Sequence, residues 1–322
     1  MLARVDRSYY RLAGWALAAL VVAFVGRRLV HDLQELATQP APANLRWSWI
    51  TLSGVLFLTA HAVLVQTWRT VLSTWDARLP FWSAARIWSV SNLGRYLPGK
   101  IWQIGAMGAM AREVGVSPIA ASGSAVLGTL VNVLAGFVVA MIGGRALLER
   151  SSQGRSTIAL LIVALAFAVL AAAPLVVPRI ALFIGRMSGR SMHATLPPRA
   201  VLYALVGNVV AWLLYGAAFE LFTGGLLGRV AGGYGEYLAA YTISYLLGYL
   251  ALFAPAGIGV REGAMMTVLT FASLATRPEA ALVALTSRVW LTLLEVVPGF
   301  LFWALAAARR RSPTHDPSDA TT

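Results

Sequence analysis

Cysteine is absent from the sequence and acidic residues are scarce. The 322 residues include no Cys, four His, and 13 Asp and Glu against 26 Lys and Arg. Without cysteine, the chain forms no disulfides, thiolate metal sites or thiol nucleophiles. Charged residues make up only 12% of the chain and hydrophobic residues 58%, whereas a soluble domain averages about 25% charged. This composition predicts an all-α polytopic membrane protein.

The net charge of +13 is compatible with nucleic acid, but in so apolar a chain it indicates basic loops that face anionic lipid. We therefore expect no nucleic-acid partner. The sequence also lacks a phosphate-binding P-loop, a dinucleotide fingerprint and a cluster of metal ligands. An intramembrane hydrolase would need Ser122 or Ser124 beside His61, the one histidine in a predicted span. We expect no cofactor, no metal and no enzymatic activity.

Six segments are long and apolar enough to cross a bilayer, which takes about 20 residues. They belong to a single domain, residues 1–310, followed by a disordered cytoplasmic tail, residues 311–322. We read the first segment as an uncleaved span, because Arg27 and Arg28 follow it without a small-residue cleavage site. The predicted spans are Leu12–Val30, Trp47–Thr67, Ile119–Ile142, Ile158–Val177, Ala200–Phe222 and Ala280–Ala307.

Two further apolar segments are interrupted by proline and glycine, which end helices and permit sharp turns. Irregular backbone at membrane depth must be buried in protein or line a wet cavity. Each interrupted segment therefore predicts a re-entrant hairpin that enters and leaves on one side of the membrane. The hairpins are Phe81–Leu97 with Lys100–Val114, broken at Pro98 and Gly99, and Tyr237–Phe253 with Val260–Leu274, broken at Pro255, Gly257 and Gly259.

The two hairpins divide the chain into half-repeats, residues 10–144 and 156–308, each reading span, span, broken hairpin, span. The tripeptide Gly-Ala-Met follows the break in both halves, at residues 105–107 and 263–265. Three full spans per half give the halves opposite orientations, as in transporters whose broken helices meet near the midplane. We therefore expect the two breaks to lie close together. The distribution of Lys and Arg places both termini in the cytoplasm.

Arg95 and Lys100 flank the first break, deep within apolar sequence. A cation at membrane depth costs at least about 2.5–3.5 kcal/mol, so a compensating partner is expected. The fork of an arginine suits a phosphate, and a lysine adds a point charge. This pattern favours capture of an anionic lipid headgroup. The alternative is a structural role, in which Arg95 reaches the cytoplasmic interface or pairs with Glu113.

Arg261 and Glu262 follow the second break directly. Arg261 is the expected counterpart of Arg95, and Glu262 either restrains it or carries a coupling proton; alternatively, the two form a structural ion pair. Arg288 and Glu295 lie about two turns apart on one face of the last span. They form either a gate or proton site facing the hairpins, or a pair that locks this helix to its neighbours.

Uncharged polar residues in the first hairpin complete the predicted substrate site, namely Asn92, Tyr96 and Gln103. Asn132 and Asn208 lie in full spans, where such residues more often serve as interhelical hydrogen-bonding groups. Glu220 and His61 are weaker site candidates.

The broken segments resemble those of a known family. Residues 91–107 read SNLGRYLPGKIWQIGAM, and residues 254–265 read APAGIGVREGAM. Together they resemble the lysylphosphatidylglycerol synthase/flippase transmembrane family, and the resemblance extends from the first span to the last. It implies a lipid-flippase fold without the cytosolic aminoacyltransferase domain of the two-part members. The matching positions are Arg95, Pro98, Gly99, Lys100, Pro255, Gly257, Gly259, Arg261 and Glu262.

The expected function is therefore that of an inner-membrane flippase for an anionic phospholipid, a glycolipid or a polyprenyl-phosphate-linked substrate. Stand-alone members of the family are linked to glycolipid and polyprenyl-phosphate-sugar pathways. Expected partners are membrane lipids and a glycosyltransferase or lipid-modifying enzyme. The alternative is a non-transporting scaffold of a cell-envelope complex, which would use the basic stretch Arg179–Arg199 for docking. The sequence leaves the oligomeric state open.

Overall fold

A computed structural model describes the parts of the chain that carry both predicted hairpins and four of the predicted spans. Within these residues every regular element is a helix, and no strand occurs. The predicted all-α fold is thereby confirmed for this part of the chain. The described residues are 27, 30, 31, 34, 44–75, 78–96, 102–145, 198–251 and 257–311.

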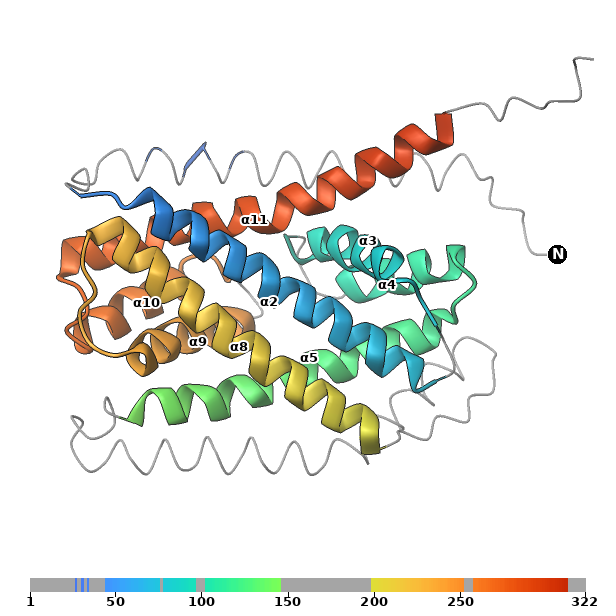
Figure 1. Cartoon of the computed structure of the whole chain (residues 1–322), viewed down its shortest axis with the longest axis horizontal. Coiled ribbons are helices and arrows are strands. Elements are labelled where there is room, and N and C mark those ends of the chain that lie inside the picture. The colour runs from blue at the N-terminus through green and yellow to red at the C-terminus, as the bar shows by residue number, and fades with distance from the viewer. Residues whose placement is uncertain are drawn as a thin grey trace, which may run out of the picture.

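Four long helices are apolar enough to cross a membrane (Figure 1). They coincide with four predicted spans, and the other two, Leu12–Val30 and Ile158–Val177, fall almost entirely outside the described residues. Each helix continues beyond its predicted apolar segment, because caps and glycine or proline residues end a helix, whereas hydropathy does not. The four helices are α2 (Trp47–Ser73), α5 (Pro118–Gly143), α8 (Pro198–Leu227) and α11 (Arg277–Arg311).

The interrupted segments form shorter helices. A 12-residue helix is about 18 Å long, which is less than the roughly 30 Å of a bilayer core. The residues between the short helices, 97–101 and 252–256, lie outside the described residues, and with them Pro98, Gly99, Lys100 and Pro255. The short helices are α3 (Phe81–Asn92) continued by η1 (Leu93–Tyr96), α4 (Trp102–Glu113), α9 (Tyr234–Leu250) and α10 (Val260–Phe271).

Glycine allows each pair of short helices to close tightly beside its break. A Cβ atom on Gly94 would lie 2.8 Å from the backbone nitrogen of Gln103. Gly257 has a φ of +73°, and a Cβ there would lie 2.8 Å from the Cα of Gly248. Both contacts are too short for a larger residue, so these glycines set how closely the paired helices approach.

The described elements occur in the order long, short, short, long, and then repeat that order. Helix α2 packs along α8, α5 packs on α9, and α11 packs on α3. If α2–α5 correspond to α8–α11, the last two contacts are equivalent, because each joins the second long helix of one set to the first short helix of the other. In Figure 1, α3 and α4 lie toward the end of the molecule where α2 ends, and α9 and α10 lie toward the end where α8 ends. The two short pairs therefore face each other along the long axis.

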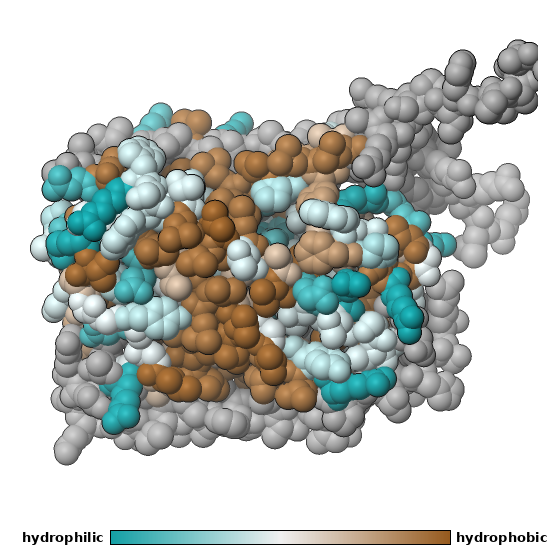
Figure 2. Space-filling view, in the orientation of Figure 1, coloured by the Kyte–Doolittle hydropathy of each residue, from teal (hydrophilic) through white to brown (hydrophobic). Residues whose placement is uncertain are grey.

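The interior is rich in aromatic side chains, and the visible surface is banded. Trp212, Tyr237 and Tyr241 are buried in the largest hydrophobic cluster, which α8, α9, α10 and α11 share. In Figure 2, hydrophobic residues form a band across the middle of the molecule, and hydrophilic residues gather toward its two ends. That pattern fits a protein whose middle lies in lipid and whose ends lie in water.

Candidate functional site

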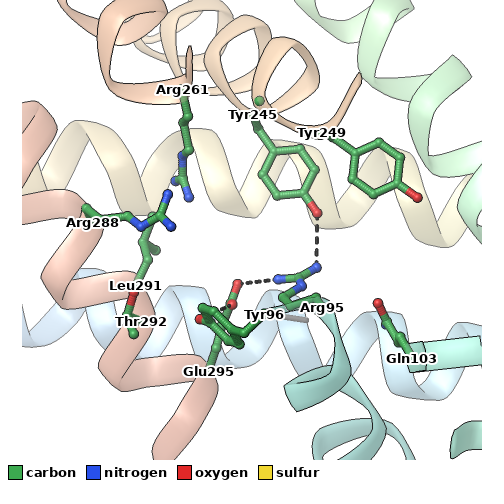
Figure 3. Close-up of a pocket in the computed structure, with 11 residues that line it drawn as sticks. Arg95, Tyr96, Gln103, Tyr245, Tyr249, Arg261, Arg288, Leu291, Thr292 and Glu295 are labelled. Atoms are coloured by element: carbon green, nitrogen blue, oxygen red, sulfur yellow. Dashed lines mark hydrogen bonds and ion pairs between the residues drawn. The ribbon is translucent and has the colours of Figure 1, made fainter. Parts of the chain in front are cut away.

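Arg95, at the end of the first short pair, reaches the last long helix. Its Nη1 lies 2.7 Å from Oε1 of Glu295, and its Nη2 donates to the hydroxyl of Tyr245 at 3.2 Å (Figure 3). The Tyr96 hydroxyl donates to the other oxygen of Glu295 at 3.1 Å. The carboxylate of Glu295 thus accepts from two neighbours in η1. This pair joins residues 200 positions apart in the sequence.

A second ion pair ties the other short helices to the same long helix. Arg288 Nη1 lies 2.9 Å from Oε1 of Glu262, and both side chains are almost fully buried. The second oxygen of Glu262 accepts from the backbone N–H of Gly259 at 2.7 Å. Glu262 therefore caps α10 and neutralises Arg288 at once, which fixes α10 against α11.

Arg261 has aromatic neighbours but no acidic partner among the described residues. Its guanidinium lies 5.5 Å from the ring centroid of Tyr241 and 5.9 Å from that of Tyr245, within range of cation–π attraction. Its Nη2 is buried and has no hydrogen-bond partner within the described part of the chain. Buried polar groups are nearly always hydrogen-bonded, so an open donor of this kind calls for an explanation.

These residues surround a cavity between the two short pairs and α11. Figure 3 shows Arg95, Arg261 and Arg288 pointing into it from η1, α10 and α11. The flanks of the two breaks therefore meet at one site, as expected, although the breaks themselves lie outside the described residues. Its lining comprises Arg95, Tyr96, Gln103, Tyr245, Gly248, Tyr249, Arg261, Arg288, Leu291, Thr292 and Glu295.

The described charges of this cavity do not balance. Glu295 pairs with Arg95 and Glu262 pairs with Arg288, which leaves Arg261 without an ion-pair partner in the described residues. A buried cation is stabilised by an anion that brings its own hydrogen-bond acceptors. Among the described residues, the site therefore holds one more cation than acid.

The observed ion pairs have other partners than those considered for the sequence, although Arg288 and Glu295 do tie the last helix to its neighbours. Glu113, the alternative partner of Arg95, lies 3.5 Å from Arg86 on α3. Arg288 and Glu295 share a helix but pair with residues of other elements, and Glu262 pairs with Arg288 although it adjoins Arg261 in sequence. Adjacent side chains on a helix point in different directions, so sequence neighbours are poor partners.

Among the predicted uncharged site residues, Asn92 and Gln103 contact each other. Gln103 Nε2 donates to Asn92 Oδ1 at 3.0 Å across the first short pair. The interhelical interpretation of Asn132 and Asn208 is confirmed, because Asn132 Nδ2 donates to Asn208 Oδ1 at 2.8 Å between α5 and α8.

A second cavity adjoins the first and shares Arg95, Gln103, Tyr245, Tyr249 and Glu295 with it. Its other lining residues include many aromatic and amide side chains. Ser124 and His61 both line it, but the Ser124 hydroxyl donates to the Ala121 carbonyl and accepts from Trp68 Nε1. No hydrogen bond joins Ser124 to His61 in the described structure, and the His61 ring packs edge-on against Trp88.

The tyrosines of α9 line the two cavities but are not among the site residues predicted from the sequence. Tyr241, Tyr245 and Tyr249 recur every four residues, so they line one face of the helix. Their rings stack along the helix. The ring centroids of Tyr241 and Tyr245 are 6.4 Å apart, and those of Tyr245 and Tyr249 are 6.2 Å apart. The four-residue spacing beside a predicted break was a usable signal for this aromatic face.

Comparison with protein-family models finds no matching family, and comparison with curated proteins finds no match. Within the described residues, no group of three or more His, Asp or Glu side chains is placed to hold a metal ion. The site is therefore interpreted from its own geometry.

Proposed function

We propose that this protein is an integral membrane transporter that binds a lipid by its anionic headgroup and moves it across the bilayer. The observation that carries the proposal is Arg261, a cation that lines a cavity at the meeting of two short helix pairs. Its buried Nη2 has no partner in the described residues. A phosphate supplies both the charge and the acceptor oxygens that this group needs.

Headgroup binding would compete with an internal anion. The carboxylate of Glu295 lies 2.7 Å from Arg95, and a phosphate entering the cavity would share or replace this contact. The phosphate would then lie between Arg95 and Arg261, with the acyl chains left in the surrounding lipid. Release would follow when Glu295 regains Arg95, so this carboxylate keeps the site from holding its ligand too tightly.

The arrangement of elements supports alternating access to this site. We propose six full spans, with α3–α4 and α9–α10 as re-entrant hairpins from opposite sides of an inverted repeat. Broken helices that meet at the repeat interface are the usual substrate site of such transporters. The reciprocal packing of α5 on α9 and of α11 on α3 is what two equivalent halves would produce.

The motif resemblance to the lysylphosphatidylglycerol synthase/flippase family agrees with this proposal. It favours an inner-membrane protein with cytoplasmic termini, working beside a glycosyltransferase or another lipid-modifying enzyme.

Reconstituted protein tests the function directly. Proteoliposomes carrying fluorescent phosphatidylglycerol in both leaflets are treated with an impermeant quencher, which reaches only the outer leaflet. The proposal predicts that more than half of the fluorescence is lost with protein, and about half in protein-free vesicles. Equal loss in both, together with co-purification of a glycosyltransferase, would instead support the scaffold interpretation.

A further inference from the structure

The lining of the second cavity indicates which chemical group is attached to the phosphate of the bound lipid. This inference rests on the proposed function. Its lining holds three tryptophans, Trp68, Trp88 and Trp212, and four tyrosines, together with the amides of several Asn and Gln residues. Ligand sites combine apolar and aromatic walls with a few polar groups that fix orientation. This composition points to a group that offers both flat apolar faces and hydroxyls.

The three tryptophans differ in one respect. Trp68 Nε1 donates to Ser124 Oγ at 2.8 Å, and Trp212 Nε1 donates to the carbonyl of Asn132 at 2.9 Å. Trp88 Nε1 is buried and has no acceptor in the described part of the chain. An indole N–H is a donor only, so the group that satisfies Trp88 must present a lone pair.

The charge of this cavity selects a neutral group. Its charged lining residues in the described structure are Arg95 and Glu295, which already pair with each other at 2.7 Å. A cavity with no excess of negative charge gives no advantage to an ammonium, even though aromatic walls attract cations. A trimethylammonium group would also offer no acceptor to Trp88.

The amides of this cavity offer both donors and acceptors. Asn132 uses its Nδ2 to donate to Asn208, and Asn92 uses its Oδ1 to accept from Gln103. The remaining atoms of these amides, one acceptor on Asn132 and one donor on Asn92, have no partner among the described residues. Hydroxyl groups match both, because each donates one hydrogen bond and accepts others.

We propose that the headgroup is a polyhydroxylated ring, a sugar or an inositol, esterified to the phosphate. The phosphate occupies the cationic cavity beside Arg261, and the ring occupies the aromatic cavity beside Trp88. The two cavities meet at Arg95, Tyr245 and Glu295, so one headgroup spans both. The ring's faces contact the aromatic walls, and one of its oxygens accepts from Trp88.

Competition between lipids tests this assignment. Purified full-length protein in detergent is loaded with fluorescent phosphatidylglycerol and titrated separately with phosphatidylinositol, phosphatidylglycerol, phosphatidylcholine and monoglucosyl diacylglycerol. Phosphatidylinositol and phosphatidylglycerol carry the same charge and differ in the ring. We expect phosphatidylinositol to displace the probe at a concentration at least fivefold lower than phosphatidylglycerol. Equal potency, or stronger displacement by phosphatidylcholine, would overturn the ring assignment.

Matched variants connect the preference to the cavity. Trp88→Phe keeps an aromatic ring and removes only the open donor, so it should remove the preference for phosphatidylinositol without weakening phosphatidylglycerol. Trp290→Phe is the control, since Trp290 Nε1 also lacks a partner in the described residues but lines neither of the two cavities. An unchanged preference in Trp88→Phe, or its equal loss in Trp290→Phe, would contradict the role of Trp88.

The same experiment separates this inference from the proposed function. If phosphatidylglycerol and phosphatidylinositol bind alike and both exceed phosphatidylcholine, the anion site stands and the ring site falls. A second outcome is that monoglucosyl diacylglycerol displaces the probe as well as phosphatidylinositol does, and that Arg261→Gln changes the displacing concentration of neither lipid. This outcome would contradict the phosphate site and, with it, the proposed function.

Discussion

At the scale of single residues, the site depends on which charges already have partners. Arg95 and Arg288 reach acids on or beside α11, whereas Arg261 lies over the rings of Tyr241 and Tyr245 and forms no ion pair within the described residues. The difference matters because burying a paired cation costs far less than burying an unpaired one. Ligand binding should therefore be most sensitive at Arg261 and at the acid that competes with the ligand, Glu295.

Glu295→Gln is expected to raise affinity for an anionic lipid while it lowers the stability of the ligand-free protein. The variant removes the internal competitor for Arg95 and leaves a partly buried cation unpaired, which costs about 1–3 kcal/mol. Thermal unfolding with and without phosphatidylglycerol measures both effects. Added lipid should raise the unfolding temperature more in the variant than in the wild type. A smaller rise in the variant would show that Glu295 does not compete with lipid.

The pair between Glu262 and Arg288 should behave as a structural unit. Arg288→Met leaves Glu262 buried without its cation, and we expect a loss of about 3–5 kcal/mol in unfolding free energy. The double variant Glu262→Gln with Arg288→Met removes both charges and keeps an oxygen to cap α10, so it should be more stable than Arg288→Met alone. Additive losses in a double-mutant cycle would mean that the two residues do not interact.

At the scale of elements, α11 connects the two pairs of short helices. It carries Glu295, which forms an ion pair with Arg95 of η1, and Arg288, which forms an ion pair with Glu262 of α10. A close contact supports the first link, because a Cβ on Gly299 of α11 would lie 2.9 Å from the Ser89 carbonyl of α3. Movement of α11 would therefore displace residues of both short helix pairs.

Gly257→Ala is expected to destabilise the second short pair and to weaken lipid binding. The residue has a φ of +73°, and its Cβ would lie 2.8 Å from the Cα of Gly248, which displaces the start of α10 and with it Arg261. Gly263→Ala is the matched control, since a Cβ there meets nothing within 4 Å and alanine favours a helix by about 1 kcal/mol. Unfolding temperature should fall in the first variant and hold or rise in the second.

The elements were easier to predict from sequence than the contacts within the site. Hydropathy placed α2, α5, α8 and α11, since a long apolar segment has few other stable conformations in lipid. Proline and glycine placed the short helices. The ion pairs were not predictable, because Arg95 and Glu295 lie 200 residues apart and pair only through tertiary packing. The tyrosines of α9 were not predicted, because they carry no charge and lie in an otherwise apolar segment.

At the scale of the whole molecule, we propose that the two ends face opposite sides of the membrane. The positive-inside rule predicts the start of α3 on the cytoplasmic side and the loop after α8 on the outer side. The native chain has no cysteine, so a single introduced cysteine reports its own position without interference. Trp82 and Val230 are suitable sites, with 72% and 39% of their surface exposed.

Labelling with an impermeant thiol reagent should distinguish the two ends. Trp82→Cys is expected to react in inverted membrane vesicles and to be protected in intact spheroplasts, and Val230→Cys is expected to show the reverse. Reaction of both variants from the same side would contradict the proposed topology. The reversed labelling pattern would be consistent with the inverted repeat but would show that the protein has the opposite orientation in the membrane.

We propose that Arg261, which has no ion-pair partner in the described residues, receives the headgroup during transport. The most direct measurement is the initial rate of phosphatidylglycerol translocation in proteoliposomes for the wild type, Arg261→Gln and Arg277→Gln. Arg277 is an exposed cation at the start of α11 and lines neither cavity, so it controls for the loss of one charge. Loss of a charge-assisted hydrogen bond costs about 1.5–3 kcal/mol, so Arg261→Gln should slow translocation roughly tenfold to a hundredfold. Arg277→Gln should match the wild type, and an Arg261→Gln variant as fast as the wild type would contradict the claim.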